Sequence, residues 1–264
     1  MEINFKESLA SLRTQTPLVH NITNYVVMNF TANALLALGA SPVMAHALEE
    51  VEDMAALSSA LVINIGTLSA QWVQGMELAM TRTLALQKPI ILDPVGAGAT
   101  PYRNLVLSQL LSNASPTIIR GNASEVQAIA GFSGHTKGVD STVSSSESVD
   151  AAIALSKATG SVVSVSGATD VIVQGEQVVF VDNGVALMTR VTGMGCSASA
   201  IAGAFAAIHA EPFEAAVLAA VCMGVCGEIA YETAQLPGSF QIAFLDALSA
   251  LTPAQFAEKA RVRY

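Results

Sequence analysis

Charged residues are scarce in this chain of 264 residues: Asp, Glu, Lys and Arg make up 12%, whereas hydrophobic residues make up 52%. A disordered chain needs the opposite balance, so the composition excludes disorder. The charges that are present are mostly acidic, and the net charge of −9 disfavours binding to nucleic acid or to an anionic membrane. Because so few charges are available to cover apolar surface, we expect an oligomer whose subunits hide part of it.

Cysteine and histidine are also few, and neither forms a metal or disulfide pattern. The three cysteines are an odd number without the spacing of a disulfide framework, which fits a reducing compartment. Cys222 and Cys226 lie one helical turn apart, but no further ligand accompanies them, so packing explains them better than metal binding. The four histidines are scattered and show no HExxH pattern. We therefore expect no catalytic zinc.

The sequence carries no sign of a secretory signal, a membrane span or a domain boundary. It begins MEINFK, with neither the basic head nor the apolar run of a signal peptide, which predicts a cytoplasmic location. The main candidate for a membrane span, residues 191–210, opens with a glycine turn and contains Thr, Ser and His, so a buried core helix fits it better. No linker divides the chain, and we expect a single domain over residues 1–264.

Short β-branched runs alternate with helical patterns along most of the chain, as in parallel strands joined by crossover helices. The predicted strands are residues 18–22, 42–44, 60–65, 89–92, 117–119 and 161–165. The predicted helices are residues 25–38, ended by Gly39, and 49–58, 70–86, 104–111 and 148–157. These patterns predict an α/β fold with a central, mostly parallel sheet flanked by helices.

The later part of the chain departs from this alternation. Residues 171–173 and 178–181 predict an antiparallel hairpin added to the sheet edge. From Cys196 onward we expect a helical C-terminal region of three or four helices, broken near Pro212, Pro237 and Pro253. Residues 131–146 are rich in Gly and Ser without periodicity, which predicts a loop that is mobile or lies over a ligand.

Polar residues gather where the predicted strands end, and ligands of open parallel sheets bind beyond those carboxyl ends. The Asn, Asp and Gly residues among them, taken singly, are also common turn formers. In chain order they are Asn21, Asn24, Asn64, Gly66, Asp93, Arg120, Gly121, Asn122, Glu125 and Gly167.

A sharper signal is the run Val191-Thr192-Gly193-Met194-Gly195-Cys196, where two close glycines open an apolar helix. Converging backbone N–H groups and a helix N-terminus can hold a phosphoryl group, although such a turn is also common before ordinary helices. Asp93 and Glu125 could orient Mg²⁺ beside it. No GxxxxGK[ST] loop is present, so we expect a kinase of another kind that transfers the phosphoryl group of ATP to a small neutral alcohol.

Several motifs together resemble the hydroxyethylthiazole kinases of thiamin salvage over nearly the whole chain. The motifs are VHNITNYV at 19–26 with Asn33, GASPVM at 39–44, DPVGAGAT at 93–100 with Arg103, IRGN at 119–122 with Glu125, GVDS at 138–141, and VTGMGC at 191–196. The resemblance implies the ribokinase-like fold, ATP and Mg²⁺, and 4-methyl-5-(2-hydroxyethyl)thiazole as acceptor. It also implies a homotrimer with active sites at the subunit interfaces, in agreement with the expectation from composition.

The resemblance also implies roles for individual residues. Met44 and Gly193 would contact the thiazole, and Asn21 or Asn24 would help to line its pocket. On the nucleotide side, Arg120 would bind the ATP phosphates, with Asn122 nearby, and Ser166 stands where the family commonly has threonine. Asp93 and Glu125 would organise Mg²⁺, and the turn from Gly193 through Gly195 to Cys196 would form the anion hole.

Cys196 departs from the aspartate base that sugar kinases of the wider superfamily carry at this turn, although the thiazole kinases share the cysteine. A neutral thiol accepts a proton poorly, but a loose phosphoryl-transfer transition state needs little early deprotonation of the alcohol. Two alternatives stay open: a kinase of the same fold for a pyrimidine alcohol or a sugar, and a non-catalytic binder of thiazole or nucleotide. A further alternative is that Cys196 serves only as a small residue packed at the start of the helix.

Overall fold

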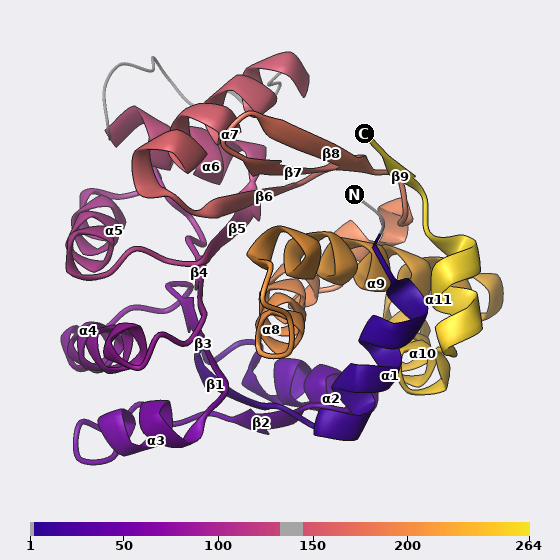
Figure 1. Ribbon diagram of the computed structural model, residues 1–264, viewed down its shortest axis with the longest axis horizontal. Helices are drawn as coiled ribbons and strands as arrows, with labels where there is room; N and C mark the ends of the chain where they lie inside the picture. The colour runs from indigo at the N-terminus through magenta and orange to yellow at the C-terminus, as the bar shows by residue number, and fades with distance from the viewer. Residues whose placement is uncertain (1–2, 133–144) are drawn as a thin grey trace.

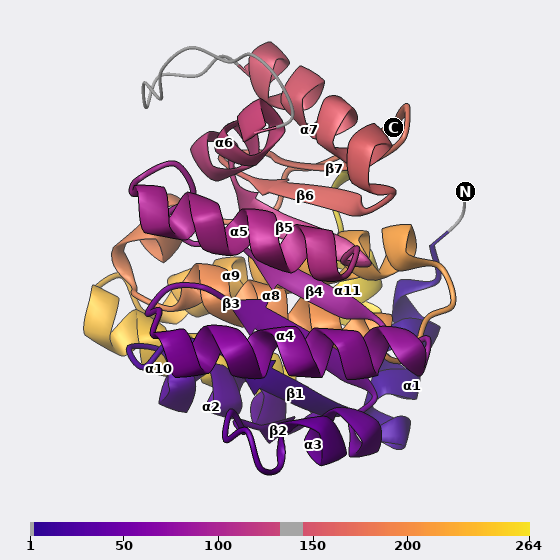
Figure 2. The same ribbon diagram turned by 90° about the vertical axis from the view of Figure 1, so that its left-hand side faces the viewer.

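The computed structural model describes residues 3–132 and 145–264. In these ranges one nine-stranded sheet runs through the centre with helices on both faces (Figures 1 and 2). The strands are β1 (Leu18–Ile22), β2 (Ser41–Val43), β3 (Ala60–Asn64), β4 (Ile90–Asp93), β5 (Ile118–Asn122), β6 (Val162–Ser166), β7 (Asp170–Gln174), β8 (Gln177–Val181) and β9 (Val262–Arg263). Their order is β2-β1-β3-β4-β5-β6-β7-β8-β9. From β2 to β6 neighbouring strands are parallel, and from β6 to β9 they are antiparallel.

Two layers of helices cover the sheet, and each has its own apolar core (Figure 1). One layer consists of α3 (Val51–Leu57), α4 (Ala70–Ala85), α5 (Pro101–Asn113), α6 (Ala123–Phe132) and α7 (Ser145–Thr159). The other consists of α1 (Phe5–Gln15), α2 (Met28–Leu38), α8 (Met194–Ala206), α9 (Pro212–Thr233), α10 (Pro237–Ala250) and α11 (Pro253–Lys259). Every residue of β3 is buried, as parallel strands covered on both faces require.

The predicted α/β alternation is confirmed, with shifted boundaries. Helix α2 begins at Met28 rather than at residue 25, because the chain first turns, with Val27 N donating to Asn24 O at 3.3 Å. Gly39 ends this helix in the left-handed conformation, at φ 108°, as predicted. Helix α5 starts earlier than predicted, at Pro101, because Thr100 caps it through Arg103 N at 3.2 Å.

The hairpin and the C-terminal helices are also confirmed, since prolines stand at the starts of α9, α10 and α11. The hairpin is added antiparallel to β6 at the edge of the parallel strands, as predicted, but the short strand β9, which was not predicted, pairs with β8 outside it. Helices α1 and α6 were not predicted. Helix α1 nevertheless carries Phe5, Leu9 and Leu12 at helical spacing, a pattern that predicts an amphipathic helix.

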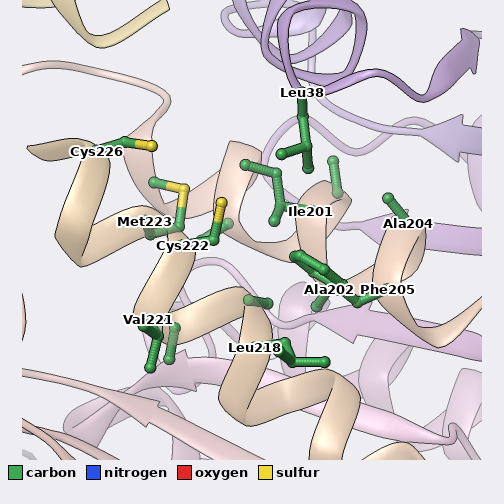
Figure 3. Close-up of a cluster of buried hydrophobic side chains, with 14 of the residues drawn as sticks. Leu38, Ile201, Ala202, Ala204, Phe205, Leu218, Val221, Cys222, Met223 and Cys226 are labelled. Atoms are coloured by element: carbon green, nitrogen blue, oxygen red, sulfur yellow. The ribbon is translucent and has the colours of Figure 1, made fainter. Parts of the chain in front are cut away.

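Helix α9 is the one helix in the described ranges that is long and apolar enough to cross a membrane. However, 83% of its apolar window is buried inside the protein, which identifies it as a core helix. The predicted candidate, residues 191–210, contains the shorter helix α8. Figure 3 shows side chains of the two helices packed together, including Phe205, Leu218 and the buried Cys222 and Cys226.

The loop predicted over residues 131–146 is wrong at both ends, where residues 131–132 belong to α6 and residues 145–146 to α7. Residues 133–144 lie outside the described ranges, so the rest of that prediction, including the GVDS motif at 138–141, stays a prediction.

Candidate active site

The candidate site lies where the order of the strands reverses. Strand β1 lies between β2 and β3, so the chain continues from β1 to one side and then crosses to the other. Crevices at such switch points are where open α/β sheets bind ligands. Here Asn24, which follows β1, meets Asn64, which ends β3, with Asn24 Nδ2 donating to Asn64 Oδ1 at 2.9 Å.

A chain of hydrogen bonds runs from this point into the sheet. Asn64 Nδ2 donates to Asp93 Oδ2 at 2.8 Å, and Ser199 Oγ of α8 donates to the same oxygen at 2.8 Å. In the other direction Asn24 Nδ2 lies 3.3 Å from Cys196 Sγ. The network thus connects the end of β4, the end of β3, the turn after β1 and the start of α8.

Asp93 is buried, and burial raises the pKa of its carboxyl group to about 6. The Arg120 guanidinium opposes this pKa shift, as do the hydrogen bonds from Ser199 and Asn64, whereas the negative charge of Glu125 adds to it. A buried acid whose pKa is shifted by burial and by specific charged neighbours marks a candidate functional site.

Glu125 connects the loops that follow β4 and β5. Its Oε1 accepts from Gly96 N and its Oε2 from Asn122 N, both at 2.9 Å. Asn122 Oδ1 in turn accepts from Glu125 N at 2.9 Å, so the two residues cap the start of α6 reciprocally. The carboxylate is therefore fixed, and each oxygen keeps lone-pair capacity for one more partner.

The glycine turn has the shape that the sequence predicted. Gly193 caps α8 with φ +90°, and a Cβ there would lie 3.0 Å from Phe30 Cδ1, so both the angle and the space demand glycine. Arg120 Nη1 donates to Gly195 O at 3.1 Å, which brings the guanidinium from β5 to this turn. The first N–H groups of a helix have no partners within the helix and can bind an anion.

Cys196 is partly buried at the first turn of α8. Burial, with the charge of Asp93, raises the pKa of its thiol to about 11. The group is therefore a neutral thiol at pH 7, and it can hydrogen-bond but cannot serve as an efficient general base.

A cavity of about 530 Å³ extends from this turn toward α9. Three predicted nucleotide-binding residues, Arg120, Asn122 and Ser166, line it, as does Gly195. The opposite wall is largely apolar and comes from residues 183–189 and from α9. The predicted acceptor-side residues Met44, Asn21, Asn24 and Gly193 do not line this cavity.

The acceptor-side residues lie near β1. Met44 follows β2 and is partly buried. Asn21 is buried within β1, where its Nδ2 donates to Val19 O at 2.9 Å while its Oδ1 has no partner. Asn24, by contrast, belongs to the network that reaches Cys196.

Sequence reasoning missed two polar residues of the site. Ser199 follows Cys196 by three residues, so helical spacing places it on the same side of α8, but small residues surround it. Asp170 begins β7 and lines the cavity, where burial raises the pKa of its carboxyl group and Arg120 opposes that shift.

Residues 9–254 match the Hydroxyethylthiazole kinase family. A hydroxyethylthiazole kinase of Leptospira biflexa is 54% identical over 245 residues, covering 93% of this chain and 92% of the relative. A hydroxyethylthiazole kinase of Syntrophus aciditrophicus is 53% identical over 256 residues, covering 97% and 95% of the two chains.

Solved structures show the same relationship. A hydroxyethylthiazole kinase protein from Pyrococcus horikoshii is 44% identical, covers 98% of both chains and superposes with a TM-score of 0.92. A ribokinase-like superfamily protein from Enterococcus faecalis, at 14% identity and a TM-score of 0.67 over 98% of this chain and 95% of its own, shares the fold. The predicted ribokinase-like α/β fold is confirmed, and the chain belongs to the hydroxyethylthiazole kinase family.

Proposed function

We propose that this chain transfers the γ-phosphoryl group of ATP to the hydroxyl group of 4-methyl-5-(2-hydroxyethyl)thiazole, as in thiamin salvage. Membership of the family supports the reaction. The observation that carries the proposal is the junction at Arg120, which binds the glycine turn and also lines the cavity. Phosphate and acceptor can meet there.

The nucleotide would occupy the cavity beside α9. Its apolar wall suits a purine ring, and Arg120, Asn122 and Ser166 at the strand ends would face the phosphates. Arginine binds phosphate oxygens through paired N–H donors, which makes Arg120 the main phosphate ligand in this proposal.

The residues present fit Mg²⁺ in the chemistry of their donors. Asp93 and Glu125 offer carboxylate oxygens close enough for the charge of Glu125 to raise the Asp93 pKa. No cluster of three or more His, Cys, Asp or Glu is found in the described part of the chain, and Mg²⁺ needs only one or two carboxylates when phosphates and waters complete its shell. When bound, Mg²⁺ would neutralise charge on the phosphate oxygens.

The acceptor would lie on the other side of the glycine turn, against Met44 and Gly193, with Asn21 or Asn24 at the rim. Its hydroxyl oxygen attacks the γ-phosphorus, the bond from that phosphorus to the β–γ bridging oxygen breaks, and ADP leaves. The hydroxyl proton passes late in the step to a phosphoryl oxygen or to water, because a loose transition state needs little early deprotonation. Cys196 acts as a neutral, positioning group, because its raised pKa keeps the thiol protonated. The N–H groups of the turn and Arg120 stabilise the charge of the transition state.

A second copy of the chain would complete the acceptor pocket. Tyr25 and Val26, directly after Asn24, are 64% and 67% exposed, which is high for such side chains next to a ligand site. This exposure supports an interface beside the acceptor pocket, and the family resemblance makes the assembly a homotrimer. We further propose that residues 1–264 function as one kinase domain in the cytoplasm.

The test is an assay of ADP formation with the thiazole alcohol, a pyrimidine alcohol and a sugar, each with ATP and Mg²⁺. Of the three acceptors, we expect only the thiazole alcohol to give turnover. Faster turnover with another alcohol would reassign the substrate. Binding of thiazole without ADP formation, in enzyme verified as folded, would make the chain a non-catalytic binder.

A further inference from the structure

Residues 259–263 hold one wall of the nucleotide cavity in place although they do not line it. They lie beyond the matched residues 9–254 and end in β9, which pairs with β8 through Phe180–Arg263 and Val181–Val262. Directly after β8 the chain enters the cavity wall at Asn183 and Gly184.

The side chains of Glu228, Arg261 and Asn183 connect this wall to residues 259–263. Glu228 of α9 accepts from Gly184 N at 2.7 Å and from Arg261 Nη2 at 2.6 Å. Arg261 also donates through Nη1 to Glu228 at 3.1 Å and through Nη2 to Asp182 O at 2.6 Å. The guanidinium thus bridges the helix and the backbone just before the wall.

Asn183 is buried, and every polar atom of its amide is used. Its Oδ1 accepts from Arg261 N at 2.7 Å, and its Nδ2 donates to Lys259 O at 2.8 Å and to Glu228 Oε1 at 3.2 Å. The chain at Asn183 also lies directly on α9, since a Cβ on Gly224 would be 2.4 Å from Asn183 Cβ. These hydrogen bonds and this contact restrain the position of Asn183 in the cavity wall.

Asp182 connects residues 259–263 to another part of the cavity lining, near Thr169. Arg263 donates to both carboxylate oxygens of Asp182, and Thr169 Oγ1 donates to Asp182 Oδ1 at 2.8 Å. Thr169 lies between Ala168 and Asp170, which both line the cavity. The hydrogen bonds from Arg263 and Thr169 also lower the pKa of Asp182 to about 2, so it stays ionised at neutral pH.

We propose that Arg261 and Glu228 are positioning residues for the nucleotide, which set the spacing of the cavity walls from outside the cavity. This inference rests on the proposed function, because it takes the cavity as the nucleotide site. Neither residue touches the acceptor side. Their loss should therefore weaken nucleotide binding while the acceptor KM and kcat stay near wild type.

The test compares Arg261→Met and Glu228→Gln with Glu232→Gln as a matched control. Glu232 lies one turn beyond Glu228 on α9 and pairs with Lys259 at 3.5 Å, but it contacts no wall residue named above. We expect the KM for ATP, and the Kd for ADP by calorimetry, to rise about fivefold to tenfold in Arg261→Met, where tenfold corresponds to about 1.4 kcal/mol. Glu228→Gln should shift both constants in the same direction.

Arg261→Lys guards against a variant that fails to fold, because it keeps the charge but cannot bind Glu228 and Asp182 O together. We expect it to give an intermediate Kd. Unchanged Kd for ADP in folded Arg261→Met, or an equal shift in Glu232→Gln, overturns the positioning role alone. Wild-type enzyme that binds no ADP overturns the proposed function together with it.

Discussion

At the scale of single residues, Asp93 combines a role in the candidate site with a cost to stability. Its carboxyl group is buried with a folded-state pKa of about 6, above the ordinary value of 3.8. A raised acid pKa stabilises the fold below the unfolded pKa, and this contribution is lost as pH rises through about 6. At pH 8 the ionised carboxylate therefore destabilises the protein relative to a neutral group of the same shape.

Asp93→Asn should abolish most turnover, because it removes a carboxylate that we propose for Mg²⁺. It should also raise stability at alkaline pH. Asn keeps an oxygen for Asn64 and Ser199 but carries no charge. From the pKa difference we expect a gain of about 3 kcal/mol at pH 8 that vanishes toward pH 4. Denaturant unfolding at both pH values, with kcat and thiazole Kd at pH 8, checks this. The same stability change at pH 4 and pH 8 would contradict it.

Arg120→Ala should raise the KM for ATP more than that for the thiazole. The guanidinium lines the cavity that we propose for the nucleotide, so its loss would remove a charged donor to the phosphates. A charge-assisted hydrogen bond contributes about 1.5–3 kcal/mol, so the KM for ATP should rise about tenfold or more. Steady-state kinetics with each substrate varied give the two constants, and an equal rise in both would indicate a folding defect instead.

Cys196→Asp should keep activity or increase it, because a carboxylate at this position could accept the hydroxyl proton and hydrogen-bond to Asn24. General-base catalysis contributes up to ~10²-fold or more when it is well placed. Repulsion from Asp93 and the phosphates should weaken ATP binding at the same time. Measurement of kcat and Tm for the Asp and Ala variants decides the matter. A folded Asp variant with far less activity than Cys196→Ala would exclude the proposed placement.

At the scale of elements, the start of α8 connects packing to chemistry. Gly193 needs a positive φ and has Phe30 and Val27 within 3.2 Å of where a Cβ would lie. The helix therefore enters the site at one fixed angle, set by contact with α2 on one side and by Arg120 on the other. Ser199 then carries the same helix into contact with Asp93.

Gly193→Ala should lower both stability and turnover. A non-glycine residue at such an angle costs about 1–2 kcal/mol, and the contact with Phe30 would shift the N–H groups that face the phosphate. We expect kcat to fall at least tenfold, a loss of about 1.4 kcal/mol in transition-state stabilisation. Gly175→Ala is the control, since its φ of +62° imposes similar strain with no atom within 4 Å of a Cβ. A comparable loss of kcat in Gly175→Ala would point to strain alone.

At the scale of the whole molecule, low charge and exposed apolar side chains both point to an assembly. The acceptor pocket that we propose includes Asn24, and the exposed side chains of Tyr25 and Val26 follow it directly. An oligomer would thus affect the acceptor side first.

Val26→Asp should break the oligomer and raise the thiazole KM, because it places a charge in the proposed interface. Light scattering after size-exclusion chromatography measures the mass. Leu105→Asp, on α5 in the opposite helix layer and 55% exposed, is the control and should keep the oligomer intact. A monomeric wild-type protein with full activity would refute the trimer.

The sequence alone predicted those features that depend on nearby residues. Strand and helix alternation, the stop at Gly39, the prolines that begin α9 to α11 and the glycine turn at Gly193 all follow from local patterning and backbone preference. The family resemblance then named the residues of the candidate site. Helix α1 has such a local pattern too, in Phe5, Leu9 and Leu12, although it was not predicted.

Pairings between distant residues were decided only when the chain folded. Nothing local predicts that β9 adds to β8, that Asn24 reaches Asn64 forty residues away, or that Ser199 binds Asp93. The same holds for the raised pKa values of Asp93 and Cys196, which arise mainly from burial. Burial and long-range hydrogen bonds are properties of the packed molecule. In the sequence, the short polar residues that form these hydrogen bonds resemble ordinary turn formers.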